Sequence, residues 1–373
     1  MTDAIAAITM PKWGLTMTEG KVVGWLKQQG QRFAEGEELL EIETTKITNV
    51  LEAPEDGILR RIVAPAGATL PVGALLAVVA PEQVPDSEVD AFVAGFPVPE
   101  PSVEREAEAE AAAPHEIEVN GRRLRYLELG EGDGVPILLV HGFGADLNTW
   151  MFTQPVLAEG RRVIAVDLPG HGGSSKEVGA GSAESSADAV EGALRELGVG
   201  RGHLIGHSMG GAIAALLALR RPDLVSSLTL IASAGLGPEI NASFIEGFVR
   251  VARRREAGEI LSLLVHDPAL VSRTMVEDVL RYKRLDGVSA ALAKISEAWF
   301  SGGCQSLDLA GRITTLTTPI QVIWGREDRI IPVAHAEALA SRFPVHIIEQ
   351  AGHLPHMEKA GEVNRLVNRF IEQ

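Results

Sequence analysis

Apolar and polar positions alternate over short distances in the first 80 residues, and glycines separate the runs. Three of these glycines return after a constant offset of 37 residues, so that Gly20, Gly30 and Gly36 correspond to Gly57, Gly67 and Gly73. Apolar positions follow the same offset: Val22 matches Leu59, Leu39 matches Leu76, and Ile42 matches Val79. The repetition predicts two similar halves of short β-strands and glycine turns. Two facing sheets would bury the matched side chains, so we expect an all-β sandwich over residues 1–80.

The pattern changes to that of an α/β domain after residue 115. Four mainly apolar runs are typical of parallel strands buried on both faces: 137–140, 163–166, 204–205 and 320–323. Helical stretches such as 187–197 alternate with these runs, as they do around a central parallel sheet. Between about residues 235 and 316 the alternation stops. Helical spacing of apolar residues such as Phe244 and Phe248 predicts an inserted helical cap there.

Residues 81–114 separate the two patterns and differ from both in composition. Proline, alanine and glutamate dominate, as in the stretches 97–101 and 104–114. Proline and like charges favour an extended, solvated chain. We therefore expect an all-β domain over 1–80, a flexible linker over 81–114, and an α/β domain with its cap over 115–373.

The composition narrows the range of functions. A net charge of −16 argues against binding nucleic acid through a basic surface and against docking on an anionic membrane. We find no signal peptide, and no apolar run reaches the roughly 18 residues of a membrane span, so we expect a cytoplasmic protein. The histidines outside the motifs below lack metal-ligand spacing, so no metal is expected. The single cysteine, Cys304, is expected to be a small core residue.

A sharp turn that carries a serine joins a predicted strand to a predicted helix. The motif Gly206-His207-Ser208-Met209-Gly210 follows the apolar run at 204–205 and precedes a helical stretch. The glycines permit a strained turn and close packing, which lift the serine hydroxyl above the sheet. A serine needs a base, a group that orients the base, and donors for the oxyanion. We interpret Ser208 as a catalytic nucleophile that has such helpers.

Candidates for these helpers lie on loops that follow predicted strands. Asp328 follows the apolar run at 320–323, and His353 comes after a glycine behind a further strand-like run. The chain order of serine, acid and histidine is the one that this architecture uses. Glu327 is the rival acid and His356 the rival base. We favour His353 because it directly follows the glycine turn.

Two backbone N–H groups are candidates for the oxyanion hole. Phe143 lies in the loop after the strand at 137–140, and Met209 follows the nucleophile. Both amides belong to turns expected at the same end of the sheet, as in related serine enzymes. We interpret the nearby His141 and His171 as residues that shape loops.

A lysine in the first domain is a candidate attachment site. Lys46 lies between two strand-like stretches, 39–43 and 47–51. We expect it at the tip of a tight hairpin, projecting into solvent. The alternative is an ordinary solvated surface lysine.

At these residues the chain resembles two known families. Residues 116–373 are similar to the α/β-hydrolases, through the serine turn and the ordered acid and histidine. The first 80 residues resemble lipoyl carrier domains, with Lys46 at the position of the lysine that receives lipoate. Biotin carriers usually have methionines beside that lysine, whereas Thr45 and Ile47 stand here. Thr45 also departs from the aspartate that lipoyl domains often have before the lysine.

The combined layout resembles the family of acetyltransferase components of acetoin dehydrogenase systems. The resemblance implies that an acetyl group moves from S-acetyl-dihydrolipoyl-Lys46 to coenzyme A. It implies lipoate on Lys46 as the cofactor. It also implies two partners, namely thiamine-diphosphate-dependent acetoin dehydrogenase subunits and a flavin-dependent dihydrolipoamide dehydrogenase.

Other functions stay open at this point. The chain lacks the His-x-x-x-Asp-Gly motif of other dihydrolipoamide acyltransferases, because none of its three Asp-Gly pairs has a histidine at the required position. A carrier-fused esterase or thioesterase is one alternative. A carrier or scaffold protein with a vestigial triad is the other.

Overall fold

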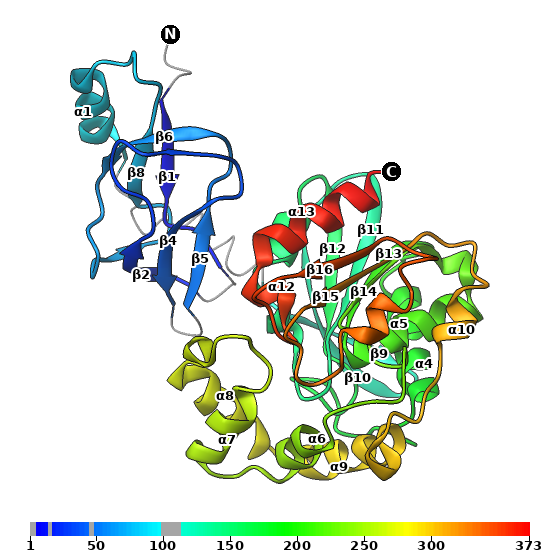
Figure 1. Cartoon of the computed structure of the whole chain (residues 1–373). Coiled ribbons are helices and arrows are strands. Elements are labelled where there is room, and N and C mark those ends of the chain that lie inside the picture. Colours follow the sequence, from blue (N-terminus) through cyan, green and yellow to red (C-terminus); the bar gives the residue numbers. More distant parts are fainter. Residues whose placement is uncertain (1–4, 14–16, 45–47, 98–112) are drawn as a thin grey trace. The chain divides into compact units, whose positions relative to one another are not determined.

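The computed structural model describes residues 5–13, 17–44, 48–97 and 113–373 (Figure 1). The chain divides into two compact units, an N-terminal unit of residues 1–111 and a C-terminal unit of residues 112–373.

The N-terminal unit contains two four-stranded antiparallel sheets. One sheet has the order β1 (Ala6–Thr9), β8 (Leu75–Val79), β6 (Gly57–Ile62) and β3 (Arg32–Phe33). The other has the order β5 (Thr48–Glu52), β4 (Glu38–Glu43), β2 (Glu19–Trp25) and β7 (Thr69–Pro71). This arrangement confirms the predicted all-β fold.

The core of this unit explains the repeat in the sequence. Leu39 and its counterpart Leu76 are both completely buried, as are Val22 and Leu59. All four side chains belong to the same apolar cluster between the sheets. The offset of 37 residues therefore marks positions that point into one shared core.

Lys46 lies outside the described residues. The strands on either side of it, β4 and β5, pair antiparallel, and Glu43 lies opposite Thr48. The expected position of Lys46 at a hairpin tip therefore stays a prediction.

The segment after β8 differs from the expectation of an extended linker that begins at residue 81. Helix α1 (Asp86–Gly95) covers the first part of it. Val89 is completely buried and packs with Val78 of β8. Arg60 donates hydrogen bonds to the Pro81 and Val84 carbonyls and pairs with Asp86 at 2.7 Å. Residues 81–96 therefore belong to the folded N-terminal unit, because tertiary contacts stabilise the helix.

The C-terminal unit contains an eight-stranded sheet of order β16, β15, β14, β13, β11, β12, β10 and β9. The strands are β9 (His115–Val119), β10 (Arg122–Leu129), β11 (Gly134–Val140), β12 (Arg161–Val166), β13 (Gly202–His207), β14 (Val225–Ile231), β15 (Ile320–Gly325) and β16 (Val345–Ile348). From β12 to β16 neighbouring strands are parallel, while β10 pairs antiparallel with β12 and β9. The sheet confirms the predicted α/β fold.

Helices pack around this sheet. They are η1 (Leu147–Trp150), α3 (Gln154–Leu157), α4 (Ala183–Glu196), α5 (Met209–Arg220), η2 (Pro222–Leu224), α10 (Ala310–Ile313), α11 (Ala334–Glu337), α12 (Pro355–Glu358) and α13 (Ala360–Ile371). Helix α5 is apolar around its whole circumference, and residues 209–218 are buried. A helix of this kind is stable only inside a domain, which is where the serine turn begins it.

The cap predicted between β14 and β15 is helical. It contains α6 (Ala242–Arg250), α7 (Arg254–Leu261), η3 (Pro268–Leu270), α8 (Arg273–Lys283), α9 (Val288–Trp299) and η4 (Ser301–Gly303). Helices α6 to α9 lie together beyond one end of the sheet (Figure 1). Cys304 follows them and is exposed, so the expectation of a core cysteine was wrong.

Candidate active site

Ser208 occupies a strained turn between β13 and α5. Its φ of 53° and ψ of −118° lie in a region that side chains other than glycine rarely adopt. The flanking glycines are required by space: a Cβ at Gly206 would lie 2.4 Å from the Gly210 carbonyl oxygen. One at Gly210 would lie 2.1 Å from that of Val140. The turn thus has the strand–turn–helix context that the motif predicts for a nucleophile.

His353 and Asp328 form a buried hydrogen-bonded pair. His353 Nδ1 lies 2.8 Å from Asp328 Oδ2, and the two side chains are 3% and 0% exposed. The second carboxylate oxygen accepts from the Ile330 and Ile331 amides at 2.8 and 3.0 Å. Because a carboxylate only accepts, Nδ1 carries the proton and Nε2 keeps its lone pair. That tautomer is the one a general base requires.

The serine turn and the histidine loop meet through His207. The His207 and His353 rings are 4.8 Å apart, and His207 Nε2–H donates to the His353 carbonyl at 2.8 Å. No hydrogen bond joins Ser208 Oγ to His353 in the described part of the chain. Such contacts are often long before substrate binds and shorten in the reacting complex.

The loop after β11 approaches the same turn. A Cβ at Gly142 would lie 3.0 Å from Ser208 Cβ and 2.9 Å from His207 Nδ1. Phe143, whose amide is one oxyanion candidate, is the next residue. The other candidate, the Met209 amide, belongs to the first turn of α5, where N–H groups lack helical partners. Both amides therefore lie on turns beside Ser208, and their role stays a prediction.

Three rings surround the side chain of Phe143. The rings of Phe248 in α6 and Phe300 are each 5.9 Å from it, and that of His171 is 6.1 Å away. Phe143 and Phe248 are both buried. The cap therefore packs directly on the loop that follows β11.

The two rival residues have other partners. Glu327 accepts a hydrogen bond from the Ala351 amide at 3.1 Å. His356 hydrogen-bonds to Thr149 Oγ1 at 3.2 Å. Burial, reinforced by the neighbouring His353, lowers the pKa of His356 to about 3, so this ring stays neutral. Glu327 also lies 3.9 Å from His266 Nδ1, beyond hydrogen-bonding distance. Among the described residues, neither rival therefore takes part in a buried hydrogen bond between a histidine and a carboxylate, as His353 and Asp328 do.

Two further residues shape the loops around the site. His141 donates from Nδ1 to the Gly142 carbonyl at 2.8 Å and accepts at Nε2 from the Leu168 amide at 3.0 Å. Burial lowers its pKa, so the ring is a neutral bridge. Asp167 is completely buried, and it accepts from Arg125 Nε at 2.5 Å and from the Leu147 amide at 2.8 Å.

Glu358 is a polar residue of the site that the motifs do not reveal. Its carboxylate accepts hydrogen bonds from the amides of Gly352 and Leu354, on either side of His353. The only signal in the sequence is an acidic residue five positions after the histidine. A short helix, α12, turns that residue back towards the histidine loop.

Other kinds of site find no support in the described residues. They contain no group of three or more histidine, cysteine, aspartate or glutamate side chains that could hold a metal ion. None of the helices that the structure describes is long and apolar enough to cross a bilayer.

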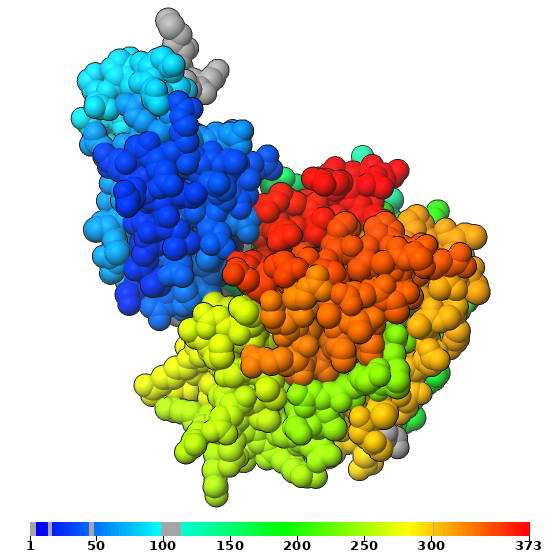
Figure 2. Space-filling model, viewed as in Figure 1, coloured from blue at the N-terminus to red at the C-terminus, as the bar shows by residue number. Residues whose placement is uncertain are grey.

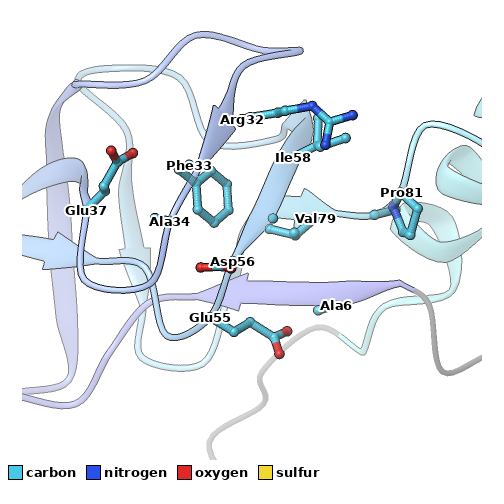
Figure 3. A pocket seen from close by; sticks show the side chains of 12 residues that line it. Ala6, Arg32, Phe33, Ala34, Glu37, Glu55, Asp56, Ile58, Val79 and Pro81 are labelled. Atoms are coloured by element: carbon cyan, nitrogen blue, oxygen red, sulfur yellow. The ribbon is translucent and has the colours of Figure 1, made fainter.

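An open hollow in the N-terminal unit is lined by Arg32, Phe33, Glu37, Asp56 and Val79, among others (Figure 3). Two of its charged groups have partners within the unit. Arg32 pairs with Glu82 at 2.8 Å, and Asp56 accepts from the Glu35 amide at 2.8 Å. We therefore place no ligand there.

The fold and the serine turn define an enzyme of the α/β-hydrolase class, joined to a carrier-type β-sandwich. Comparison with protein families agrees: residues 135–360 match the α/β hydrolase fold, and residues 6–79 match the biotin/lipoyl family, described as biotin-requiring enzyme. Among solved structures, a meta-cleavage product hydrolase from Pseudomonas fluorescens IP01 matches with a TM-score of 0.64 and 24% identity. The match covers 70% of this chain and 98% of that one, and it shows the fold alone.

Curated relatives match over the whole length. The dihydrolipoyllysine-residue acetyltransferase component of the acetoin cleaving system of Pseudomonas putida is 46% identical over 369 residues, 99% of each chain. Its counterpart from Cupriavidus necator is 42% identical over 371 residues, 100% of this chain and 98% of the relative. The chain belongs to this family of acetyltransferase components of acetoin cleaving systems.

Proposed function

We propose that the chain transfers an acetyl group from S-acetyl-dihydrolipoyl-lysine to coenzyme A, with Ser208, His353 and Asp328 as its catalytic triad. The buried Asp328–His353 pair beside the strained serine turn is the observation that carries the proposal. The family supports the reaction, because full-length relatives are named for acetyl transfer on dihydrolipoyl-lysine.

The acetyl donor requires a carrier group on the N-terminal unit. We propose that lipoate is attached to Lys46, where it would supply a dithiol that carries the acetyl group as a thioester. The antiparallel pairing of β4 and β5, the described strands on either side of Lys46, supports this proposal. The match of residues 6–79 to the biotin/lipoyl family supports the same position.

The triad performs acylation by proton transfer at one nitrogen. Asp328 keeps the proton of His353 on Nδ1, so Nε2 can take the proton from Ser208 Oγ. The oxygen attacks the thioester carbonyl, the carbon–sulfur bond breaks, and the proton passes from Nε2 to the leaving sulfur. The product is an acetyl ester on Ser208.

Deacylation repeats these steps in reverse with a different thiol. His353 Nε2 takes the proton of the coenzyme A thiol, and the sulfur attacks the acetyl ester. The bond to Ser208 Oγ then breaks, and the oxygen regains the proton from Nε2. In both steps the amides of Phe143 and Met209 would donate to the oxyanion, and the loss of one such donor typically costs about 3 kcal/mol of transition-state stabilisation.

Transfer rather than hydrolysis requires that water is kept from the acetyl ester. The aromatic contacts of Phe143 with Phe248 and Phe300 bring the cap onto the loop that follows β11. The near-complete burial of His353 is consistent with a site of low water content. We propose that the cap excludes water while a thiol enters.

Two partner enzymes follow from this chemistry. A thiamine-diphosphate-dependent acetoin dehydrogenase would supply the acetyl group, and a flavin-dependent dihydrolipoamide dehydrogenase would reoxidise the dithiol. The names of the relatives support an assembly, since each is a component of an acetoin cleaving system.

A product assay tests the function. The full chain is incubated with S-acetyl-dihydrolipoamide, with and without coenzyme A, and acetyl-CoA and acetate are measured by liquid chromatography and mass spectrometry. We expect rapid acetyl-CoA formation and slow release of acetate. Equal acetate release with and without coenzyme A would instead indicate a thioesterase. Turnover unchanged in Ser208→Ala would indicate a vestigial triad.

A further inference from the structure

Hydrogen bonds hold the backbone at His353 and at both of its neighbours. The His353 N–H donates to the Leu264 carbonyl at 2.8 Å, and its carbonyl accepts from His207 Nε2 at 2.8 Å. Glu358 Oε1 accepts from the preceding amide, that of Gly352, at 2.8 Å, and from the following amide, that of Leu354, at 3.3 Å. The ring itself is held by Asp328, so little freedom remains for the imidazole.

The other oxygen of Glu358 reaches a different part of the chain. Oε2 accepts from the His266 amide at 2.6 Å. His266 belongs to residues 262–266, the cap segment between α7 and η3. One carboxylate therefore joins the histidine loop to the cap across 92 positions of sequence. In the space-filling view this yellow-green part of the cap lies against the orange segments that follow β15 (Figure 2).

Further contacts hold the cap segment against the catalytic loops. Arg329, next to Asp328, donates from Nη2 to the carbonyls of Ser262 and Val265, each at 2.5 Å. Gly352 permits this close packing, because a Cβ there would lie 2.8 Å from the Val265 carbonyl carbon. The cap segment and the loops of the acid and the base are thus one hydrogen-bonded unit.

The environment of Glu358 suits a carboxylate that accepts hydrogen bonds from backbone amides. Burial raises its pKa above the ordinary value, while its three amide donors act in the opposite direction. The electrostatic interaction with His266 also lowers the pKa. Hydrogen bonds from N–H groups to a carboxylate are stronger than those to a neutral acceptor, so the charge tightens the loop.

We propose that Glu358 is a positioning residue for His353 and couples the cap segment 262–266 to the general base. This inference rests on the proposed function, in which His353 moves the proton of Ser208. The position of the cap segment and the orientation of the His353 imidazole are then coupled, so one does not change without the other. Loss of the carboxylate lets the histidine loop shift relative to Ser208 without removing any group that touches the substrate.

The test is Glu358→Gln in the full chain, with Glu362→Gln as its control. Glutamine offers one acceptor oxygen and one N–H₂ donor, so it cannot accept from both the His266 amide and the amides that flank His353. Glu362 is an exposed glutamate four residues later, in α13. We expect kcat of Glu358→Gln to fall by about 10- to 100-fold, because small misplacements of a reacting group have effects of this size. The KM for S-acetyl-dihydrolipoamide should change less than about threefold, and the control should match the unmodified chain.

A spectroscopic signature separates positioning from a general structural effect. The proton between His353 Nδ1 and Asp328 gives a downfield ¹H NMR resonance that depends on their geometry. It should shift or broaden in Glu358→Gln at a temperature where circular dichroism shows a folded chain. An unchanged resonance together with unchanged kcat overturns the proposal. If Glu358→Gln does not fold, Glu358→Asp decides: a displaced resonance and lowered kcat support the proposal, and unchanged values overturn it.

Failure of the proposed function would look different. Acylation of Ser208 by a small activated ester needs Ser208 and His353 but neither lipoate nor coenzyme A. An unmodified chain that reacts with the ester but forms no acetyl-CoA refutes acetyl transfer. If Glu358→Gln reacts with the ester at the unmodified rate and keeps the resonance, the positioning role alone is refuted.

Discussion

Replacing Asp328 by asparagine removes the charge of the proposed orienting acid and keeps its shape. In the native chain Oδ1 accepts from two backbone amides, those of Ile330 and Ile331, and Oδ2 faces His353 Nδ1. In Asp328→Asn the single amide oxygen will keep the two backbone donors. The N–H₂ group will then face Nδ1, which has to become an acceptor, so the ring proton moves to Nε2.

The size of the effect follows from these contacts. A hydrogen bond to a charged group contributes about 1.5–3 kcal/mol, which at about 1.4 kcal/mol per tenfold corresponds to roughly a 10- to 150-fold change in rate. The tautomer change adds to this loss, because Nε2 can no longer take the serine proton. In a serine protease the same exchange lowers kcat by about 10⁴. We therefore expect a loss between about 10² and 10⁴ for Asp328→Asn.

The assay is acetyl-CoA formation from S-acetyl-dihydrolipoamide, run beside hydrolysis of a small activated ester. Both rates should fall together, since both require the same base. Glu327→Gln is the matched control, because this neighbouring carboxylate contacts the Ala351 amide instead of His353. Its rates should stay within about threefold of the unmodified chain. An Asp328→Asn protein that keeps its activity, or an equal loss in Glu327→Gln, would refute the assignment of the acid.

Three other outcomes follow. Ser208→Ala should lose at least about 10³-fold in acetyl transfer while thermal unfolding shows a folded chain, and an unchanged rate would contradict a serine nucleophile. Lys46→Arg should abolish acyl loading at residue 46, measured by peptide mass spectrometry, and should leave acetylation of Ser208 and ester hydrolysis unchanged. Burial keeps His356 neutral with a pKa of about 3, so its contribution to stability is present above about pH 6.5 and is lost as the pH falls towards 3. His356→Gln should therefore reduce the slope of the unfolding free energy below pH 6.5 by up to about 1.4 kcal/mol per pH unit, and an unchanged slope would contradict a buried neutral ring at this position.

The sandwich was predictable because the positions that repeat in the sequence are the ones that form its core. Leu39 and Leu76 recur at a fixed offset and are both fully buried between the sheets. The serine turn was predictable for a similar reason. A Cβ added at Gly206 or Gly210 would lie less than 2.5 Å from a backbone oxygen, so only glycine fits at either position. The motif and the strained conformation of Ser208 therefore depend on one another.

Contacts between distant segments were not predictable in the same way. Helix α1 lies in a proline-flanked, charged stretch, and it depends on pairs such as Arg61–Asp90 at 2.6 Å. Its apolar residues Val89, Phe92 and Val93 do have helical spacing, but only the sheet beneath gives that face a partner. The role of Glu358 was even less predictable, because its hydrogen bond to the His266 amide depends on how the cap folds back onto the histidine loop.

In the proposed mechanism Ser208 carries the acetyl group between two thiols. The most direct measurement of this step is peptide mass spectrometry of the full chain after rapid mixing with S-acetyl-dihydrolipoamide and acid quenching, without coenzyme A. We predict one acetyl group on the peptide that contains Ser208. When coenzyme A is added before the quench, this group should disappear and an equimolar amount of acetyl-CoA should form. Acetyl-CoA formation at the full rate with no acetylated Ser208 at any time would contradict this mechanism and indicate direct attack by coenzyme A on the donor thioester.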